Sequence, residues 1–441
     1  MKIEEFAAFF QLDPVTCDFM AHHGFAEAEA SYCDPPPGLT EAKILDRWHK
    51  LELSFDPAPV LRTAARARAS EEIKHLYHYL AFYWWRLKNC EPYGYRLARF
   101  DSAAGSEDGA MLELVLALDG CDAIEATHAR LGLPPEYARA IEKNIAFQIG
   151  KYLQTHGRPG YPESGHHWAR FYVEGRLFRL GRLEYMIEPA PLRFTPAVFR
   201  RRRDGRVIAL CRDGWRLNRE GLQLWRDEPP ESAYCTALLD TEGDRIRGIP
   251  VNPAGFAEVD RSVVLPRGEF EPLWSDWDLV PDVHIPGGGN MRIELCLESF
   301  REAMEFFPRY FHRTPAGFTS VSWIFNPDFA ALLPDSNLAR FMRELYLGPF
   351  ASSGLDGLNF VFGREAADWS DFPEDNSLRR AFHNLRRAGR RLKCGSMFLE
   401  ARGMAQFGSQ IYRREFPDVL PARGGTLHRD SVFSGKTPLD S

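Results

Sequence analysis

The chain has 441 residues, of which 44% are hydrophobic and 26% are charged, and this composition is ordinary for a globular protein of two or three domains. The formal net charge of −6 excludes a general attraction to nucleic acid or to an anionic membrane surface. The most apolar stretches, residues 80–87 and 111–118, are too short to span a bilayer, and the first five residues lack the apolar core of a signal peptide. We therefore expect a cytoplasmic protein with no membrane span and no nucleic-acid partner.

Cysteine and histidine are placed in a way that argues against a metal site. The eight cysteines contain no C-x-x-C pair, and none stands at zinc-ligand spacing from histidines. In a chain of this length, free buried thiols in a reducing compartment are a better interpretation than a disulfide framework. The neighbouring His166 and His167 have no carboxylate at metal-ligand spacing, so we expect both to be solvated and expect no metal cofactor.

The first third of the chain has the hydrophobic periodicity of helices. Apolar residues recur there at intervals of three and four, as in helices that pack one face on a core. Thr40 suits the N-cap of one helix, and Pro134-Pro135 suits the start of another. The predicted helices are residues 39–53, 71–87, 110–118 and 135–153. We expect residues 1–155 to form a helical domain.

A segment rich in glycine and proline, residues 156–162, marks the end of this domain. Short apolar runs follow it and are separated by turn residues. The predicted strands are residues 183–187, 207–211 and 237–239. This order predicts an antiparallel meander at the start of a second domain.

From residue 278 onward, the predicted strands and helices alternate. The strands are residues 279–285, 318–325, 358–362 and 396–399, and the helices are residues 294–307, 336–347 and 377–388. An antiparallel opening followed by this alternation predicts an α+β protein in which helices flank one mixed β-sheet, over residues 165–402. Residues 403–441 are rich in glycine, arginine, serine and proline, and we expect a flexible tail or a docking arm.

The most informative stretch joins the predicted strand 279–285 to the helix that follows. It contains Pro286, which ends the strand, and then Gly287, Gly288 and Gly289. Glycine lets the backbone approach a ligand closely, and the unpaired amides at a helix start favour phosphate oxygens. A flexible turn without a ligand is the alternative interpretation of the same residues.

Several motifs in this order resemble a bacterial family of acyltransferases. In that family, a helical N-acyltransferase amino-terminal domain precedes a GNAT-like carboxy-terminal domain. The resemblance runs from about residue 40 to about residue 400, and the order of predicted elements from the central strand onward agrees with the GNAT pattern. The motifs are residues 178–183, residues 282–286 with Gly288-Gly289, Ser322-Trp323, and Ser336-Asn337 with Phe341.

The resemblance implies a site for the donor substrate, acyl-coenzyme A. Residues 279–285 would be the central splayed strand that hydrogen-bonds the pantetheine arm, and its last residue, Ile285, would open the phosphate loop. Gly287, Gly288, Gly289 and Asn290 would hold the pyrophosphate. GNAT enzymes usually have glutamine or arginine at the start of this loop, and this chain does not. That departure leaves open whether the donor is free coenzyme A or an acyl carrier protein.

Acyl transfer to an amine needs a base for the amine proton, and His284 suits that role because its ordinary pKa lies near neutrality. Asp282 is two residues away on the same strand face and could orient the imidazole or raise its pKa. A hydrogen-bonded core histidine beside a buried aspartate is the alternative. GNAT enzymes often have glutamate on this strand, so a histidine here is itself a departure.

Two further residues are candidates for the acid or for oxyanion stabilisation. Tyr346, near the end of the predicted helix 336–347, resembles the general-acid tyrosine that GNAT enzymes often carry, although its periodicity also suits core packing. Ser322 could donate to a thiolate or an oxyanion, and alternation along its strand places it on the face of Ser320.

From these residues we expect a two-domain N-acyltransferase that moves an acyl group from acyl-coenzyme A to a small-molecule amine by direct attack. Two other functions remain open. A non-catalytic GNAT-like module would bind an acyl thioester or a partner protein, and the atypical loop favours it. A thioesterase would use His284 to activate water, and it would release thiol without an amine.

Overall fold

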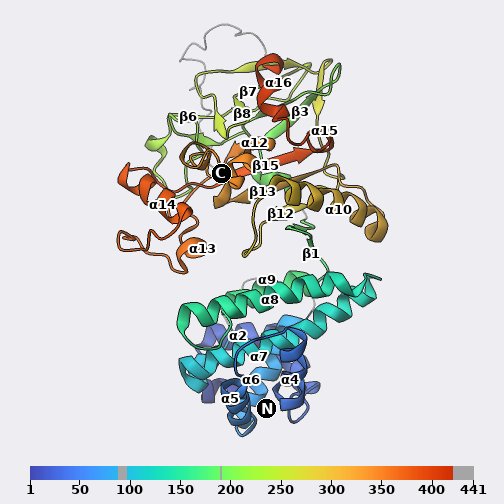
Figure 1. Ribbon diagram of the computed structural model, residues 1–441, viewed down its shortest axis with the longest axis vertical. Coiled ribbons are helices and arrows are strands. Elements are labelled where there is room, and N and C mark those ends of the chain that lie inside the picture. The colour runs from blue at the N-terminus through green and yellow to red at the C-terminus, as the bar shows by residue number, and fades with distance from the viewer. Residues whose placement is uncertain (88–96, 189–190, 421–441) are drawn as a thin grey trace, which may run out of the picture. The chain divides into compact units, whose positions relative to one another are not determined.

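The computed structural model describes residues 1–87, 97–188 and 191–420 (Figure 1). These residues form two compact units. The amino-terminal unit comprises Met1–Leu180 with Pro286–Gly288, and the carboxy-terminal unit comprises Gly181–Ile285 and the chain from Gly289 onward. The first is helical and the second is built on β-sheets with flanking helices, which confirms the α+β class.

The helices of the amino-terminal unit pack around α7, which contacts α4, α5, α6, α8 and α9. Ser70 caps α6 by accepting a hydrogen bond from the amide of Ile73, and most aromatic side chains of α6 are buried. The predicted helices are present, and the structure adds α1 to α3, α5 and α9, which the sequence analysis did not predict. The elements are α1 (Ile3–Phe10), α2 (Pro14–His22), α3 (Phe25–Ala30), η1 (Pro37–Leu39), α4 (Glu41–Lys50), α5 (Ala58–Arg68), α6 (Glu71–Trp85), α7 (Phe100–Arg130), α8 (Pro135–His156), α9 (Glu163–Val173) and β1 (Leu177–Leu180).

The continuous part of the amino-terminal unit ends at Leu180, later in the chain than the predicted domain boundary. Helix α9 packs on α6 and α7, and β1 packs on α8, so both elements belong with the helices before them. Within α9, His166 is fully buried, and its Nε2 lies 2.7 Å from Oε2 of Glu113 on α7. The expectation that His166 is solvated is therefore wrong.

The main sheet of the carboxy-terminal unit contains the strand order β2-β12-β13-β15-β14. Strands β12 and β13 are parallel, and the other neighbouring pairs are antiparallel. The sheet is therefore mixed, as predicted. Its strands are β2 (Leu183–Met186), β12 (Asp282–His284), β13 (Gly317–Ser322), β14 (Tyr346–Pro349) and β15 (Gly395–Glu400).

One face of this sheet is covered by α10 (Ile293–Phe311), which follows β12 in the chain (Figure 1). Tyr185 and Phe318 point to this face, and their rings contact Phe300 of α10. Because side chains alternate along a strand, Asp282, which is paired with Met186 and Thr319, faces the opposite side. Helix α10 therefore leaves the Asp282 face free for other elements.

A second, antiparallel sheet has the strand order β11-β3-β4-β8-β9. The sequence predicts one sheet, and the structure differs because the meander forms its own sheet. The Tyr346 hydroxyl joins the two sheets by donating to the carbonyl of Val251. The strands are β3 (Ala197–Arg201), β4 (Val207–Leu210), β8 (Pro250–Asn252), β9 (Phe256–Ala257) and β11 (Phe270–Pro272), and two ribbons pair β5 (Arg216–Leu217) with β6 (Cys235–Thr236) and β7 (Arg245–Gly248) with β10 (Val263–Pro266).

Three predictions of secondary structure in this unit are wrong. Residues 237–239, predicted as a strand, follow β6, which ends at Thr236, and are not part of a strand. Residues 358–362, predicted as a strand, form the short helix α13 (Leu358–Phe362), which lies between Gly357 and Gly363, both with positive φ. A run of five mostly apolar residues does not distinguish a strand from a helical turn. The predicted helix 336–347 ends early as α12 (Asn337–Glu344), and Tyr346 begins strand β14. The other helical elements are η2 (Pro191–Phe194), η3 (Pro230–Ser232), η4 (Trp323–Phe325), α11 (Phe329–Leu332) and α14 (Ser377–Arg387).

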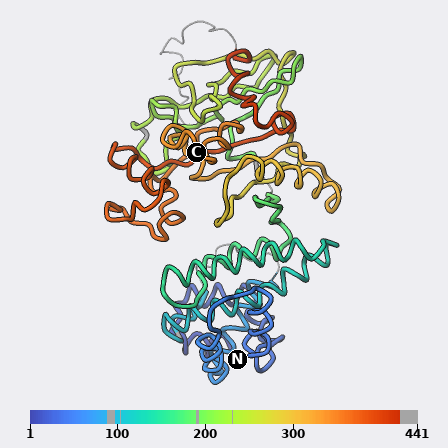
Figure 2. Tube along the Cα trace, in the orientation of Figure 1, coloured from blue at the N-terminus to red at the C-terminus, as the bar shows by residue number. Residues whose placement is uncertain are grey.

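The chain after the main sheet also differs from the predicted flexible tail. It forms α15 (Ala401–Ala405) and α16 (Ile411–Val419), and α16 places Phe416 and Val419 in the core of the second sheet. Figure 2 shows this carboxy-terminal segment beside strands from much earlier in the chain. Residues 421–441, the rest of the predicted tail, lie outside the described residues.

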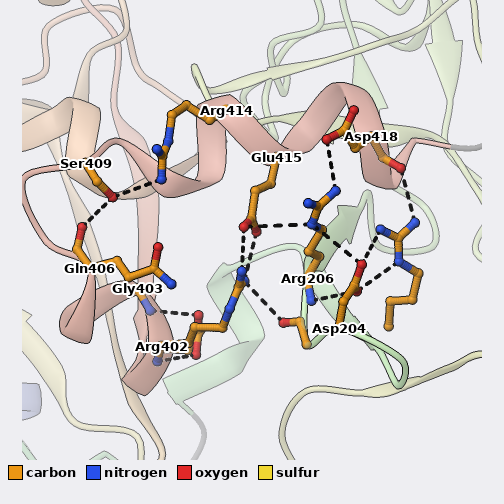
Figure 3. A network of polar contacts seen from close by, with 12 residues as sticks. Asp204, Arg206, Arg402, Gly403, Gln406, Ser409, Arg414, Glu415 and Asp418 are labelled. Carbon is orange, nitrogen blue, oxygen red and sulfur yellow. Dashed lines mark hydrogen bonds and ion pairs between the residues drawn. The ribbon is translucent and has the colours of Figure 1, made fainter.

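A network of ion pairs and hydrogen bonds fixes these two helices (Figure 3). Arg402 binds both carboxylate oxygens of Glu415, with Nη1 2.8 Å from Oε2. Arg206 reaches Asp418 at 2.9 Å, and arginines hold the Asp204 carboxylate so that its pKa falls to about 2, chiefly through its hydrogen bond with Arg201. The turn between β3 and β4 is thereby tied to α16.

Among the described residues, the structure contains no helix that is both long enough and apolar enough to cross a bilayer.

Candidate functional site

Strand β12 occupies the centre of the candidate site because its two neighbours leave it at different points. On one side it pairs with β2 along its whole length, as far as His284 opposite Glu184. On the other side, its pairing with β13 is found at Asp282 and Thr319 and does not continue to His284 within the described residues. Pro286 then follows, and proline has no amide to donate to a ladder. The parallel strands therefore part just where the predicted base lies.

His284 and Asp282 are brought together as predicted. Their side chains lie on the same face of β12, with Nε2 of His284 3.2 Å from Oδ2 of Asp282. Each side chain is 25% exposed, so neither belongs to the closed core. Part of each side chain is thus open to a ligand, while Nε2 of His284, which faces Asp282, is itself buried.

The charges around His284 favour its protonated form. Burial lowers the pKa of the imidazole, but the hydrogen bond and the negative charge of Asp282, with smaller contributions from Glu184 and Glu188, outweigh burial and raise that pKa above 6.5. Glu184 is buried directly opposite His284 on β2. The site therefore contains an imidazole whose proton affinity is raised by carboxylates on two strands.

The loop after β12 is held by side chains of the carboxy-terminal unit. The guanidinium of Arg182 donates to the carbonyl oxygens of Gly289 and Asn290, each at 3.1 Å. The side-chain amide of Asn337, at the start of α12, donates to Oδ1 of Asn290 at 2.7 Å. These contacts fix the end of the loop that leads into α10.

Glycine is needed in this loop for two reasons. Gly288 has a φ of +76°, in the left-handed region that other residues rarely adopt. A β-carbon on Gly289 would lie 2.8 Å from Nε of Arg182, so a side chain there would displace the clamp. Helix α10 begins after Arg292, whose side chain makes no capping hydrogen bond. A glycine loop that runs into an uncapped helix start suits an anionic group.

A small cavity of about 60 Å³ lies on the Asp282 face of the sheet. Strands β12 and β13 supply one wall, and Glu188 with residues 193–195 supplies the other. Thr319 lines this cavity, and its buried Oγ1 has no hydrogen-bond partner among the described residues. The lining residues are Glu188, Arg193, Phe194, Thr195, Asp282, Thr319, Ser320 and Val321.

The other two predicted residues are placed differently. Tyr346 is buried, and its hydroxyl accepts from the amide of Ala209 and donates to the carbonyl of Val251, so its hydrogen-bonding capacity is used between the sheets. Ser322 ends β13 on the face of Ser320, as predicted, and its Oγ accepts from the amide of Ile324. Neither side chain lines the cavity, and by alternation Ser322 points away from Asp282.

The sequence analysis missed four residues of this site, namely Glu184, Glu188, Arg193 and Thr319. Glu184 lies just after the motif 178–183, but its position opposite His284 depends on strand register. Thr319 lies in the predicted strand 318–325, and no local pattern distinguishes it from a core threonine. These residues become neighbours through pairing of strands that are far apart in the chain. Hydrophobic periodicity along the sequence does not predict which strands pair.

Comparisons with known proteins agree with this geometry. A family model described as GNAT-like C-terminal domain matches residues 177–399, just over half of the chain. Comparison with curated proteins finds no significant sequence relative. One similar solved structure, with a TM-score of 0.58 and 16% identity, is an acyltransferase in complex with decanoyl-CoA and teicoplanin. Another, with a TM-score of 0.57 and 16% identity, is an acyltransferase in complex with CoA and 10C-teicoplanin. In both cases the match covers 91% of this chain and 99% of the other chain.

Proposed function

The chain belongs to the GNAT-like C-terminal domain family, and from this premise we propose that it transfers an acyl group from acyl-coenzyme A to an amine acceptor. The observation that carries the proposal is the partly exposed His284–Asp282 pair, which lies on the strand that leads into the glycine loop. Similar solved acyltransferases in complex with decanoyl-CoA or with CoA support it. Because those structures are only 16% identical to this chain, the teicoplanin bound in them does not identify the acceptor of this protein.

The loop between β12 and α10 is the part of the chain that fits the pyrophosphate of the donor. Gly287, Gly288, Gly289 and Asn290 would surround the phosphates, and the amides at the start of α10 would add partial positive charge. Arg182 would hold this loop in place from the carbonyl side. This arrangement replaces the glutamine or arginine that usually opens the loop in GNAT enzymes.

The chemistry follows from the position of His284. The amine nitrogen attacks the thioester carbon, a C–N bond forms, and the C–S bond breaks. His284 takes the proton that the amine loses, and the thiolate leaves and is protonated as free thiol. Asp282 holds the imidazole and stabilises its protonated form. Tyr346 is not assigned the acid role, because both its hydrogen bonds are with backbone groups.

The donor site is tested by calorimetric titration of acyl-coenzyme A thioesters into the wild type, Gly288→Asp and Gly288→Asn. The two variants share the same shape and the same strain at positive φ, and only aspartate adds a negative charge beside the phosphates. We expect Gly288→Asp to bind much more weakly than Gly288→Asn. Equal binding by the two variants would place the pyrophosphate elsewhere.

The reaction is tested by release of free thiol from acyl-coenzyme A with and without a panel of amines. We expect release that depends on the amine. Binding without release would favour a non-catalytic module, release without any amine would favour a thioesterase, and no binding of any coenzyme A thioester would favour an acyl carrier protein as donor.

A further inference from the structure

The cavity on the Asp282 face has a polarity that the proposed reaction does not by itself require. Asp282 on β12 and Glu188 both line it and supply carboxylates. Both carboxylates also favour the protonated form of His284. A group bound in this cavity therefore lies beside the negative charges that surround the base.

Thr319 gives independent evidence that the cavity accommodates a polar group. Its side chain is only 1% exposed, and Oγ1 has no hydrogen-bond partner among the described residues. A buried hydroxyl without a partner destabilises the fold, so proteins rarely keep one unless a ligand or water satisfies it. The neighbouring carboxylate and the open cavity point to a donor as that ligand.

Arg193 supplies the opposite charge at the mouth of the same cavity. Its guanidinium is exposed and lies 4.3 Å from the centre of the Phe194 ring, which also lines the cavity. In the part of the chain that the structure describes, no carboxylate pairs with it. An arginine held on a ring without an anionic partner is suited to bidentate binding of a carboxylate from a ligand.

From this arrangement we propose that the cavity binds the amino-acid end of the acceptor, with its ammonium group at Thr319, Asp282 and Glu188 and its carboxylate at Arg193. The inference rests on the proposed function and names its substrate class, an α-amino acid with a free carboxylate. The rest of the acceptor lies outside the cavity.

The size of the cavity agrees with this class of ligand. Its volume of about 60 Å³ is small. A single water needs roughly 10–15 Å³ of such volume, so the cavity accommodates only a few heavy atoms. An amino group, its carbon and an adjacent carboxylate fit that limit, whereas a sugar ring does not.

The test is direct binding by calorimetry of three small molecules to the full chain. L-leucine carries both charges, 3-methylbutylamine lacks the carboxylate, and 4-methylpentanoate lacks the amine. We expect L-leucine to bind at least about tenfold more tightly than either analogue, since each lost charge-assisted contact is worth about 1.5 kcal/mol or more.

Two variants locate the binding. Thr319→Val keeps the shape of the side chain and removes the hydroxyl, and we expect L-leucine and 3-methylbutylamine both to bind several-fold more weakly. Arg193→Gln should weaken L-leucine about tenfold and leave 3-methylbutylamine unchanged. The matched control is Arg226→Gln, since Arg226 is also an exposed arginine over an aromatic ring, that of Trp225. It should change neither.

The outcomes separate this inference from the proposed function. Equal binding of L-leucine and 3-methylbutylamine, no binding of L-leucine, or an equal effect of the two arginine variants would overturn the inference. Amine-dependent thiol release would still support acyl transfer in each of these cases. Conversely, selective binding of L-leucine without any thiol release would support the amino-acid site and contradict the proposed acyl transfer.

Discussion

Each unit of this protein contains a histidine paired with a carboxylate, and the two pairs differ in their surroundings rather than in their chemistry. In the amino-terminal unit, His166 is fully buried and lies 2.7 Å from Glu113, which is 12% exposed. In the carboxy-terminal unit, His284 and Asp282 are each 25% exposed and lie 3.2 Å apart.

Access of a ligand to the imidazole, rather than pairing with a carboxylate, therefore distinguishes the candidate base. His166 contacts the rings of Trp84, Trp85 and Tyr161, which close the core around it. His284 lies instead where β12 parts from β13, beside a cavity and before a glycine loop. A buried pair of this kind holds helices together, and an open one can exchange a proton with a ligand.

The largest effect on stability is expected at the closed pair. His166→Phe keeps an aromatic ring, though a larger one, and leaves the Glu113 carboxylate without its partner, which should lower the free energy of unfolding by about 3 kcal/mol. Denaturant unfolding measures the change. A loss below about 0.5 kcal/mol would mean that the pair does not hold α7 to α9.

A smaller loss is expected at the network that orders the carboxy-terminal helices. Arg402→Leu removes the two hydrogen bonds to Glu415 and should cost about 1–2 kcal/mol, with local loosening of α16. Hydrogen exchange of the α16 amides reports that loosening. Arg414→Leu, which removes a single exposed contact with Ser409, is the control and should leave the exchange unchanged.

The smallest effect is a shift in pH dependence at the open pair. Asp282 raises the pKa of His284, so activity that needs the neutral imidazole should rise with pH through a midpoint above 6.5. Asp282→Asn should move this midpoint to lower pH, because the charge that favours the protonated form is gone. Glu113→Gln should leave the midpoint where it is. An Asp282→Asn midpoint that does not move, or that rises, would contradict the pairing.

The same pKa shift has a consequence for stability. Because the pKa of His284 is higher in the folded protein than its ordinary value of 6.5, the pair stabilises the fold fully below pH 6.5. That contribution is lost as pH rises through the raised pKa. Asp282→Asn should remove this part of the pH dependence of unfolding.

The sequence predicted the elements with strong local signals. The periodicity of α6 and α8 and the alternation of strand and helix around β12 correctly gave the α+β class. The pair of His284 and Asp282 could be found because two residues along a strand share a face.

The failures come from information that is not local. The apolar run of residues 358–362 suits both a strand and a helical turn, and the glycines that flank it bound a short helix in the structure. Glycine and arginine after residue 403 suggested a flexible tail. Phe416 and Val419 instead pack into a core formed by strands that are distant in sequence. Glu184 and Thr319 join the site through strand register, which no stretch of sequence carries.

We propose that the open histidine, His284, performs acyl transfer and that the closed one, His166, does not. The most direct test is amine-dependent release of free thiol from acyl-coenzyme A by the wild type, His284→Ala and His166→Phe, expressed per folded molecule. We predict that His284→Ala loses about 100-fold or more, as expected for a general base, and that His166→Phe keeps the wild-type rate. Release by His284→Ala at the wild-type rate, or equal losses in both variants, would contradict the account.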